Sequence, residues 1–187
     1  MKKLIPLLLV VLTFAACEKD PDTDKLDNKY LVYTNYDAKA DFKAFQTYYR
    51  PASILIIGDK KEAEYWKDDN AQEILQAYAT NMSNRGYVRV DDRDEANLGL
   101  QVSYIKSTYY FNDYGRPEWW WNYPGYWDAP YWGNWGGWYY PYVVNYSITT
   151  NSFLTEIMNL KAPEGDNQKL PVLWSSFLSG PASYSGK

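Results

Sequence analysis

The fold is decided by residues 69–105, DNAQEILQAYATNMSNRGYVRVDDRDEANLGLQVSYI, which contain the clearest helix of this 187-residue chain and a strand after it. Asp69, with Gln72 three residues later, has the pattern of a helix N-cap and its capping-box partner, and Gly86 supplies a left-handed stop. We therefore expect a helix over residues 69–85. Its apolar residues recur at the spacing of one helix face: Ala71, Ile74, Leu75, Tyr78 and Met82.

Strands are expected on both sides of this helix, where β-branched and aromatic residues alternate or where short apolar runs end at Gly or Pro. The predicted strands are residues 30–37, 47–50, 53–59, 87–90, 98–105, 142–149, 153–160 and 172–179. KAPEGDNQK, residues 161–169, is the predicted hairpin loop between the last two strands. These elements predict an α+β fold, an antiparallel sheet with one principal helix packed on it and a long aromatic-rich loop.

The first seventeen residues, MKKLIPLLLVVLTFAAC, have the order of a bacterial secretion signal, with two lysines before an apolar run over residues 4–16. That run is shorter than the roughly 20 apolar residues that span a bilayer. Small residues directly before Cys17 resemble the lipobox of bacterial lipoproteins, which implies that Cys17 becomes a lipidated N-terminus. The alternative is an ordinary signal peptide, cut near Ala15 and Ala16, followed by a stray cysteine.

If the lipobox is used, residues 1–16 are removed, and residues 17–29 are the lipidated cysteine and a polar, flexible tether. One α+β domain then follows over residues 30–187. Glu18 is not the aspartate that retains enteric lipoproteins in the inner membrane, so we expect an outer-membrane protein. The sequence leaves open whether the domain lies on the periplasmic or on the surface-exposed face.

Composition excludes several classes of function. The chain has 19 basic and 23 acidic residues, a net charge of −4 with no basic block, which argues against nucleic-acid partners. The absence of histidine rules out His-based triads and His-ligated zinc. The acidic turn at residues 91–95 lacks the glycine and the final glutamate of a calcium loop and is expected to be a solvated turn. We therefore predict no enzyme activity, no catalytic residue, no metal and no cofactor.

The segment 109–142 is the most unusual part of the chain, because 17 of its 34 residues are aromatic. Four prolines and five glycines break any regular period, which predicts a long loop or irregular hairpin. The segment could pack on one sheet face and complete the core, form a recognition surface for a glycan or an envelope protein, or dock at the membrane interface. Candidate ligand-binding residues are Trp119, Trp127, Trp132, Trp135, Trp138, Tyr126 and Tyr131.

Several short motifs resemble those of bacterial lipoproteins grouped as domain of unknown function 4136. They are YDAKADFKAFQTY at residues 36–48, NRGYVRV at 84–90, DEANLGLQVSYI at 94–105 and VLWSSFLSG at 172–180. The resemblance implies an α+β envelope protein and carries no catalytic residue across. That family usually continues into a C-terminal helix, whereas this chain stops at Lys187, so either the sequence is incomplete or that last element is missing.

Together these features predict a non-enzymatic cell-envelope lipoprotein of unknown specific role, held to the membrane by Cys17 and acting through binding or structural interaction. The alternative is a surface lipoprotein that binds or processes glycans with its Trp- and Tyr-rich segment. A glycan or an envelope protein is the partner that these two hypotheses imply.

Overall fold

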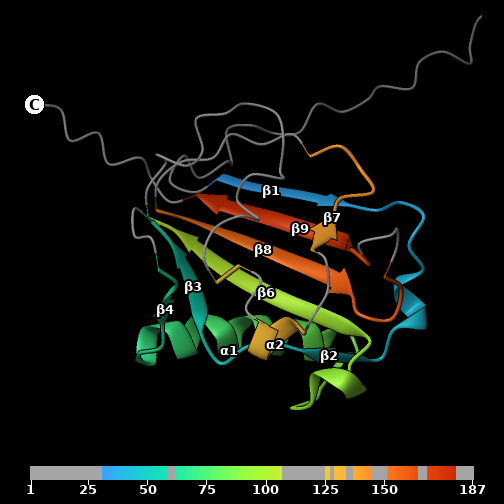
Figure 1. Ribbon diagram of the computed structural model, residues 1–187, viewed down its shortest axis with the longest axis horizontal. Coiled ribbons are helices and arrows are strands. Elements are labelled where there is room, and N and C mark those ends of the chain that lie inside the picture. The colour runs from blue at the N-terminus through green and yellow to red at the C-terminus, as the bar shows by residue number, and fades with distance from the viewer. Residues whose placement is uncertain are drawn as a thin grey trace, which may run out of the picture.

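The computed structural model describes residues 31–58, 62–106, 125–126, 129–133, 137–144, 151–163 and 168–179. These residues form an α+β arrangement of a nine-stranded sheet with one long helix (Figure 1). The strands are β1 (Leu31–Tyr36), β2 (Thr47–Tyr49), β3 (Ile54–Ile57), β4 (Glu64–Trp66), β5 (Val88–Arg89), β6 (Leu98–Ile105), β7 (Trp138–Tyr139), β8 (Ser152–Asn159) and β9 (Leu170–Ser179). The helices are α1 (Asp69–Asn84), α2 (Ala129–Trp132) and the 3-10 turns η2 (Phe42–Ala44) and η3 (Arg93–Glu95).

The sheet is mixed, which corrects the expectation of a purely antiparallel one. Its main order is β1-β9-β8-β6-β2-β5, with β3 beside β6, β4 beside β3 and β7 beside β9. The four long strands pair antiparallel, whereas β2 and β3 run parallel to β6, β5 runs parallel to β2, and β7 runs parallel to β9. Alternation of apolar residues predicts which face of a sheet a side chain takes, but it carries no information on strand direction.

Helix α1 begins at Asp69, the first residue of the predicted range, but its N-cap differs from the predicted one. Its N-cap is Asp68, not Asp69, because the Asp68 carboxylate accepts a hydrogen bond of 3.0 Å from the backbone N–H of Ala71. Gln72 does not close a capping box and instead donates its side-chain amide to the carbonyl of Ala52 at 2.9 Å. The predicted stop is confirmed, since Gly86 has a φ of 88° and its N–H bonds to Ser83 O.

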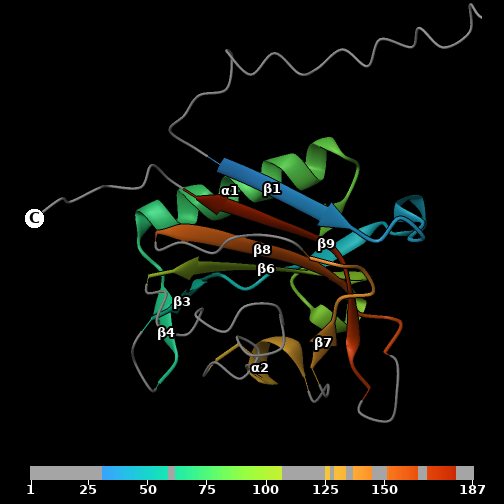
Figure 2. The same ribbon diagram turned by 90° about the horizontal axis from the view of Figure 1, so that it is seen from above.

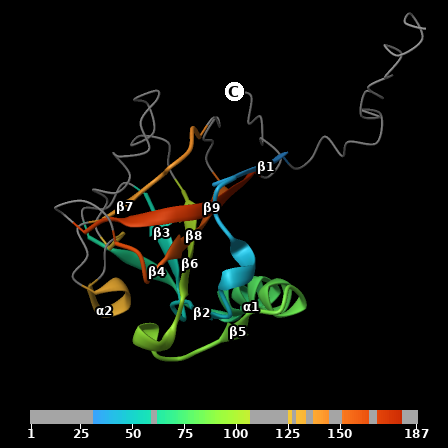
Figure 3. The same ribbon diagram turned by 90° about the vertical axis from the view of Figure 1, so that its right-hand side faces the viewer.

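Strand β6 divides the core into two layers. Leu98, Leu100 and Val102 face α1, whose Leu75 and Met82 are buried against this side of the sheet. The residues between them point to the opposite face, where α2 and β7 lie (Figures 2 and 3). A strand covered on both faces explains why almost every residue of β6 is buried.

Most predicted strands are confirmed within a residue or two of their ends, although β5 has two residues where four were expected. The predicted strand 142–149 is not seen in its described part, since residues 142–144 are irregular and 145–149 lie outside the described residues. Strands β4 and β7 and helix α2 were not predicted, because two to four residues are too few to show a period. Among the described residues, no helix is long and apolar enough to cross a membrane.

Residues 1–30 and 180–187 lie outside the described residues. The first of these ranges contains the predicted signal peptide, Cys17 and the tether. The second contains the end of the chain, where the sequence raised the question of a C-terminal helix. The division into these segments and one domain therefore stays a prediction.

Candidate functional site

The candidate site lies on the face of the sheet that α1 does not cover, and its floor comes from β6, β8 and β9. Residues paired directly across neighbouring strands share one face, so the register assembles this floor in three rows. The rows are Gly99, Met158 and Val172; Gln101, Glu156 and Ser175; and Ser103, Leu154 and Phe177. All of these residues are buried, and the middle row is polar throughout.

Aromatic side chains from the segment 125–142 cover this floor. Tyr126, Trp132 and Trp138 have at most 1% of their surface exposed, although the regular elements described in this segment, α2 and β7, are short. Trp132 and Trp138 meet edge to face with ring centres 5.7 Å apart, and Tyr126 meets Trp138 at 5.2 Å. This is the geometry that aromatic pairs prefer in cores.

Gly99 is the point at which the aromatic segment comes closest to the sheet. A Cβ atom built there would lie 2.6 Å from Cζ3 of Trp132 and 2.5 Å from Sδ of Met158. Carbon atoms in ordinary contact are about 3.5–4.0 Å apart, so only glycine leaves room for the indole on this strand. Because Gly99 has no side chain, the indole of Trp132 can pack directly against the backbone of β6.

Hydrogen bonds join the aromatic segment to the polar row of the floor. The indole N–H of Trp132 donates to Oε1 of Gln101 at 2.7 Å. The phenols of Tyr126 and Tyr140 both donate to the carboxylate of Glu156, which is fully buried. A buried carboxylate is costly unless it is hydrogen-bonded, and these two phenols supply such bonds.

Tyr142 extends the network to β9. Its phenol donates to Oγ of Ser175 at 3.1 Å. Burial raises the pKa of Tyr142 well above its usual value, the Ser175 contact opposes this rise, and the negative charges of Glu156 and Asp37 add to it. Tyr142 is therefore protonated at neutral pH and can act as a hydrogen-bond donor.

This arrangement is suited to holding a segment on a sheet. The polar atoms described above bond to one another beneath aromatic rings, and the buried carboxylate of Glu156 is covered by two phenols. In the part of the chain that the structure describes, no group of three or more acidic or cysteine side chains could hold a metal ion.

The structure separates the predicted ligand-binding residues into three groups. Tyr126, Trp132 and Trp138 are core residues, and their rings do not reach the surface. Tyr131 is half-buried and packs edge to face on Tyr65 at 5.8 Å. The remaining three, Trp119, Trp127 and Trp135, lie outside the described residues, and so does Cys17, the separate candidate for lipidation.

Gln101 and Glu156 are the site residues that sequence reasoning missed. Each occupies a strand position whose neighbours on both sides face α1, so the strand period alone places it on the opposite face. The sequence did contain a sign of these two residues, because each is a polar residue within a strand of mainly apolar residues. This sign could not identify their partners, because Trp132 and Tyr126 come from a segment without a periodic pattern.

Comparison with known proteins places these observations in a family context. Residues 32–186 match the family described as "Domain of unknown function (DUF4136)". The chain is also similar to a DUF4136 family protein from Bacteroides thetaiotaomicron VPI-5482 known from a crystal structure. The two share 58% sequence identity over 85% of this chain and 86% of that chain, with a TM-score of 0.77. A search of curated proteins finds no match.

Proposed function

Since this chain belongs to the DUF4136 family, whose function is unknown, we propose a role from its own residues. We propose that it is a lipid-anchored protein of the outer membrane, without enzymatic activity, that acts through binding or structural interaction. The order of charges, apolar run and small residues before Cys17 supports the anchor. The polar residues 18–29 would then tether the folded domain to the membrane surface.

The anchor is tested by replacing Cys17 with serine. The wild-type chain should incorporate a fatty-acid label and sediment with membranes, because acyl chains are what would hold a lipoprotein stably at the membrane. Cys17→Ser should lose the label and leave the membrane fraction, whereas Asp20→Asn in the tether should behave like the wild type. Equal labelling and retention of the serine variant would contradict lipidation at Cys17.

For the segment 109–142 we propose a structural role, in which its aromatic residues complete the core on the second face of the sheet. The observation that carries this proposal is the burial of Trp132 and Trp138, together with the hydrogen bond from Trp132 to Gln101. A buried Trp replaced by alanine typically costs about 3–5 kcal/mol of stability. Trp132→Ala should therefore lower the melting temperature strongly, and Tyr131→Ala, at a half-buried position, should lower it much less.

Glycan binding by the same segment is the alternative proposal. It depends on Tyr131 and on Trp119, Trp127 and Trp135, and no contact among the described residues favours it over packing. A glycan array with the wild-type protein and Trp127→Ala tests it. A bound glycan that the variant loses, with an unchanged melting temperature, would support recognition over packing.

A further inference from the structure

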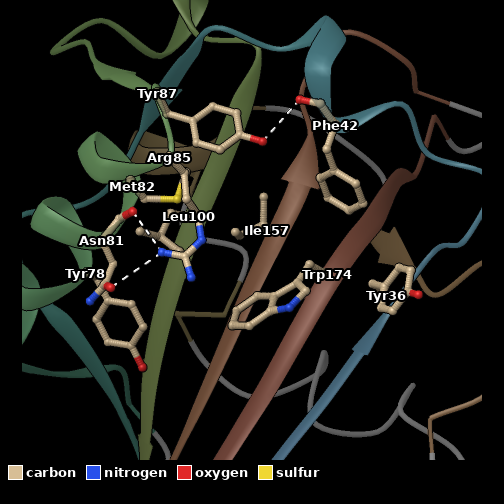
Figure 4. A pocket seen from close by; sticks show the side chains of 10 residues that line it. All are labelled: Tyr36, Phe42, Tyr78, Asn81, Met82, Arg85, Tyr87, Leu100, Ile157 and Trp174. Carbon is tan, nitrogen blue, oxygen red and sulfur yellow. Dashed lines mark hydrogen bonds between the residues drawn. The ribbon is translucent and has the colours of Figure 1, made fainter.

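A groove lies on the other face of the sheet, next to α1 and away from the aromatic segment. Helix α1 covers β6, but the strands beyond β6 leave a cavity of about 530 Å³ beside the helix (Figure 4). The register places one residue from each of four neighbouring strands in its floor. Across the sheet these residues are Leu100, Ile157, Trp174 and Tyr36.

The walls of the groove are also mainly apolar. Tyr78 and Met82 come from the inner side of α1, and Phe42 and Tyr87 close one end. The phenol of Tyr87 donates to the carbonyl of Phe42 at 3.1 Å, which holds the two residues of this end together. The groove is thus a preformed apolar surface with an open side, within the size range of about 300–1,000 Å³ typical of small-molecule sites.

One charged residue borders the groove. Arg85 is the C-cap residue directly after α1, one turn beyond Asn81, and Figure 4 shows its guanidinium extending over the groove toward Ile157 and Trp174. Its Nη1 donates to the backbone carbonyl of Asn81 at 3.0 Å and lies 3.5 Å from the side-chain oxygen of the same residue. Within the described part of the chain, Nη2 and Nε of Arg85 have no hydrogen-bond partner.

The charge of Arg85 is not neutralised by a neighbouring acid in the described residues. The ion pairs found there join Arg89 to Asp91 and Arg93 to Asp94, and no aspartate or glutamate lines the groove. The position of Arg85 at the end of α1 accounts for its bonds to the helix, because helix C-termini favour cations. This position does not explain why Nη2 and Nε of Arg85 extend over an apolar groove.

We propose that this groove binds an amphipathic carboxylate. The apolar part of the ligand would lie along the row from Leu100 to Tyr36, and its carboxylate would bond to Arg85, whose planar guanidinium suits that group. The inference goes beyond the proposed function. It concerns the face opposite the aromatic segment, so either proposal can fail without the other.

Isothermal titration of the full chain with sodium dodecanoate, below its micellar concentration, tests the proposal. We expect saturable binding of one molecule per chain. Arg85→Gln should weaken this binding by about tenfold or more, the scale of one lost charged hydrogen bond. Arg85→Lys should keep part of the affinity, and Arg89→Gln, which removes an exposed cation on β5 outside the groove, should keep all of it.

A neutral probe separates the charge from the apolar floor. Dodecanol should bind more weakly than dodecanoate to the wild type, and Arg85→Gln should not change its affinity. Trp174→Ala should weaken both probes, with circular dichroism confirming that the variant is folded. The proposal is wrong if dodecanoate shows no saturable binding, or if Arg85→Gln binds dodecanoate as tightly as the wild type.

Discussion

Gly99→Ala tests whether Trp132 is seated on the sheet as described. The new Cβ would lie 2.5 Å from Met158 Sδ, 2.6 Å from Trp132 Cζ3 and 3.2 Å from Leu160 Cδ2. Reaching ordinary carbon contacts requires the indole to move by about 1 Å. Trp132 and Met158 are both buried, so neither can move into solvent.

The expected cost follows from this geometry. Forcing extra volume into a packed core costs about 1–3 kcal/mol, whereas replacing glycine by alanine within a strand would otherwise gain about 0.5–1 kcal/mol. The net cost lies between about 0 and 2.5 kcal/mol. Because two buried groups approach the new Cβ to less than 3.0 Å, we expect the upper part of this range, a loss of about 1–2 kcal/mol in the free energy of unfolding, measured by urea unfolding followed by circular dichroism. Gly58→Ala is the matched control, because its Cβ would meet Lys106 at an ordinary 3.8 Å, and it should be close to neutral.

A double-mutant cycle assigns the cost to the indole. Trp132→Leu is destabilising by itself, but it removes one of the two closest contacts of the new Cβ and leaves those with Met158 and Leu160. In that background Gly99→Ala should cost clearly less than in the wild type, and the difference is a coupling energy of about 0.5–2 kcal/mol, within the range for residues in contact. An equal cost of Gly99→Ala in both backgrounds, or a cost no greater than that of Gly58→Ala, would refute the seating of Trp132 on β6.

Three further predictions concern α1 and the polar network. Leu75→Ala should cost about 2–5 kcal/mol, because this side chain is buried under α1, whereas the exposed Gln76→Ala should be near neutral in the same thermal melts. Asp68→Ala should cost about 1 kcal/mol in urea unfolding and Asp69→Ala much less, since Asp68 caps the helix and Asp69 does not. A larger cost for Asp69→Ala would mean that Asp69 is the N-cap, as the sequence pattern predicted. Burial raises the pKa of Tyr142 in the folded protein, so its contribution to stability is complete below pH 10 and is lost as the pH rises above 10. Tyr142→Phe should make the stability fall less steeply between pH 9 and pH 11, and an unchanged slope would mean that this phenol is not desolvated.

Local patterns of the sequence were sufficient to identify the elements whose apolar residues repeat at a regular spacing. The spacing of apolar residues in α1 and the run of β6 identified both elements, because a helix or strand with a buried face must repeat its apolar residues at its own period. Gly86 marked the end of α1, because it takes a left-handed conformation there. The short motifs also identified the family, which the match over residues 32–186 confirms.

Strand neighbours and directions were decided only by the tertiary structure. The period of a strand is the same whether its neighbour is parallel or antiparallel, so the parallel pairing of β2 and β3 with β6 could not be predicted. The same holds for the two sites. Trp132 meets Gln101 only because α2 packs on the face of β6 that α1 does not cover, and Leu100 lines up with Tyr36 only because β6, β8, β9 and β1 lie side by side. Sequence periodicity fixes the face on which a side chain lies, but contacts between residues far apart in the chain depend on which strands become neighbours when the whole core packs.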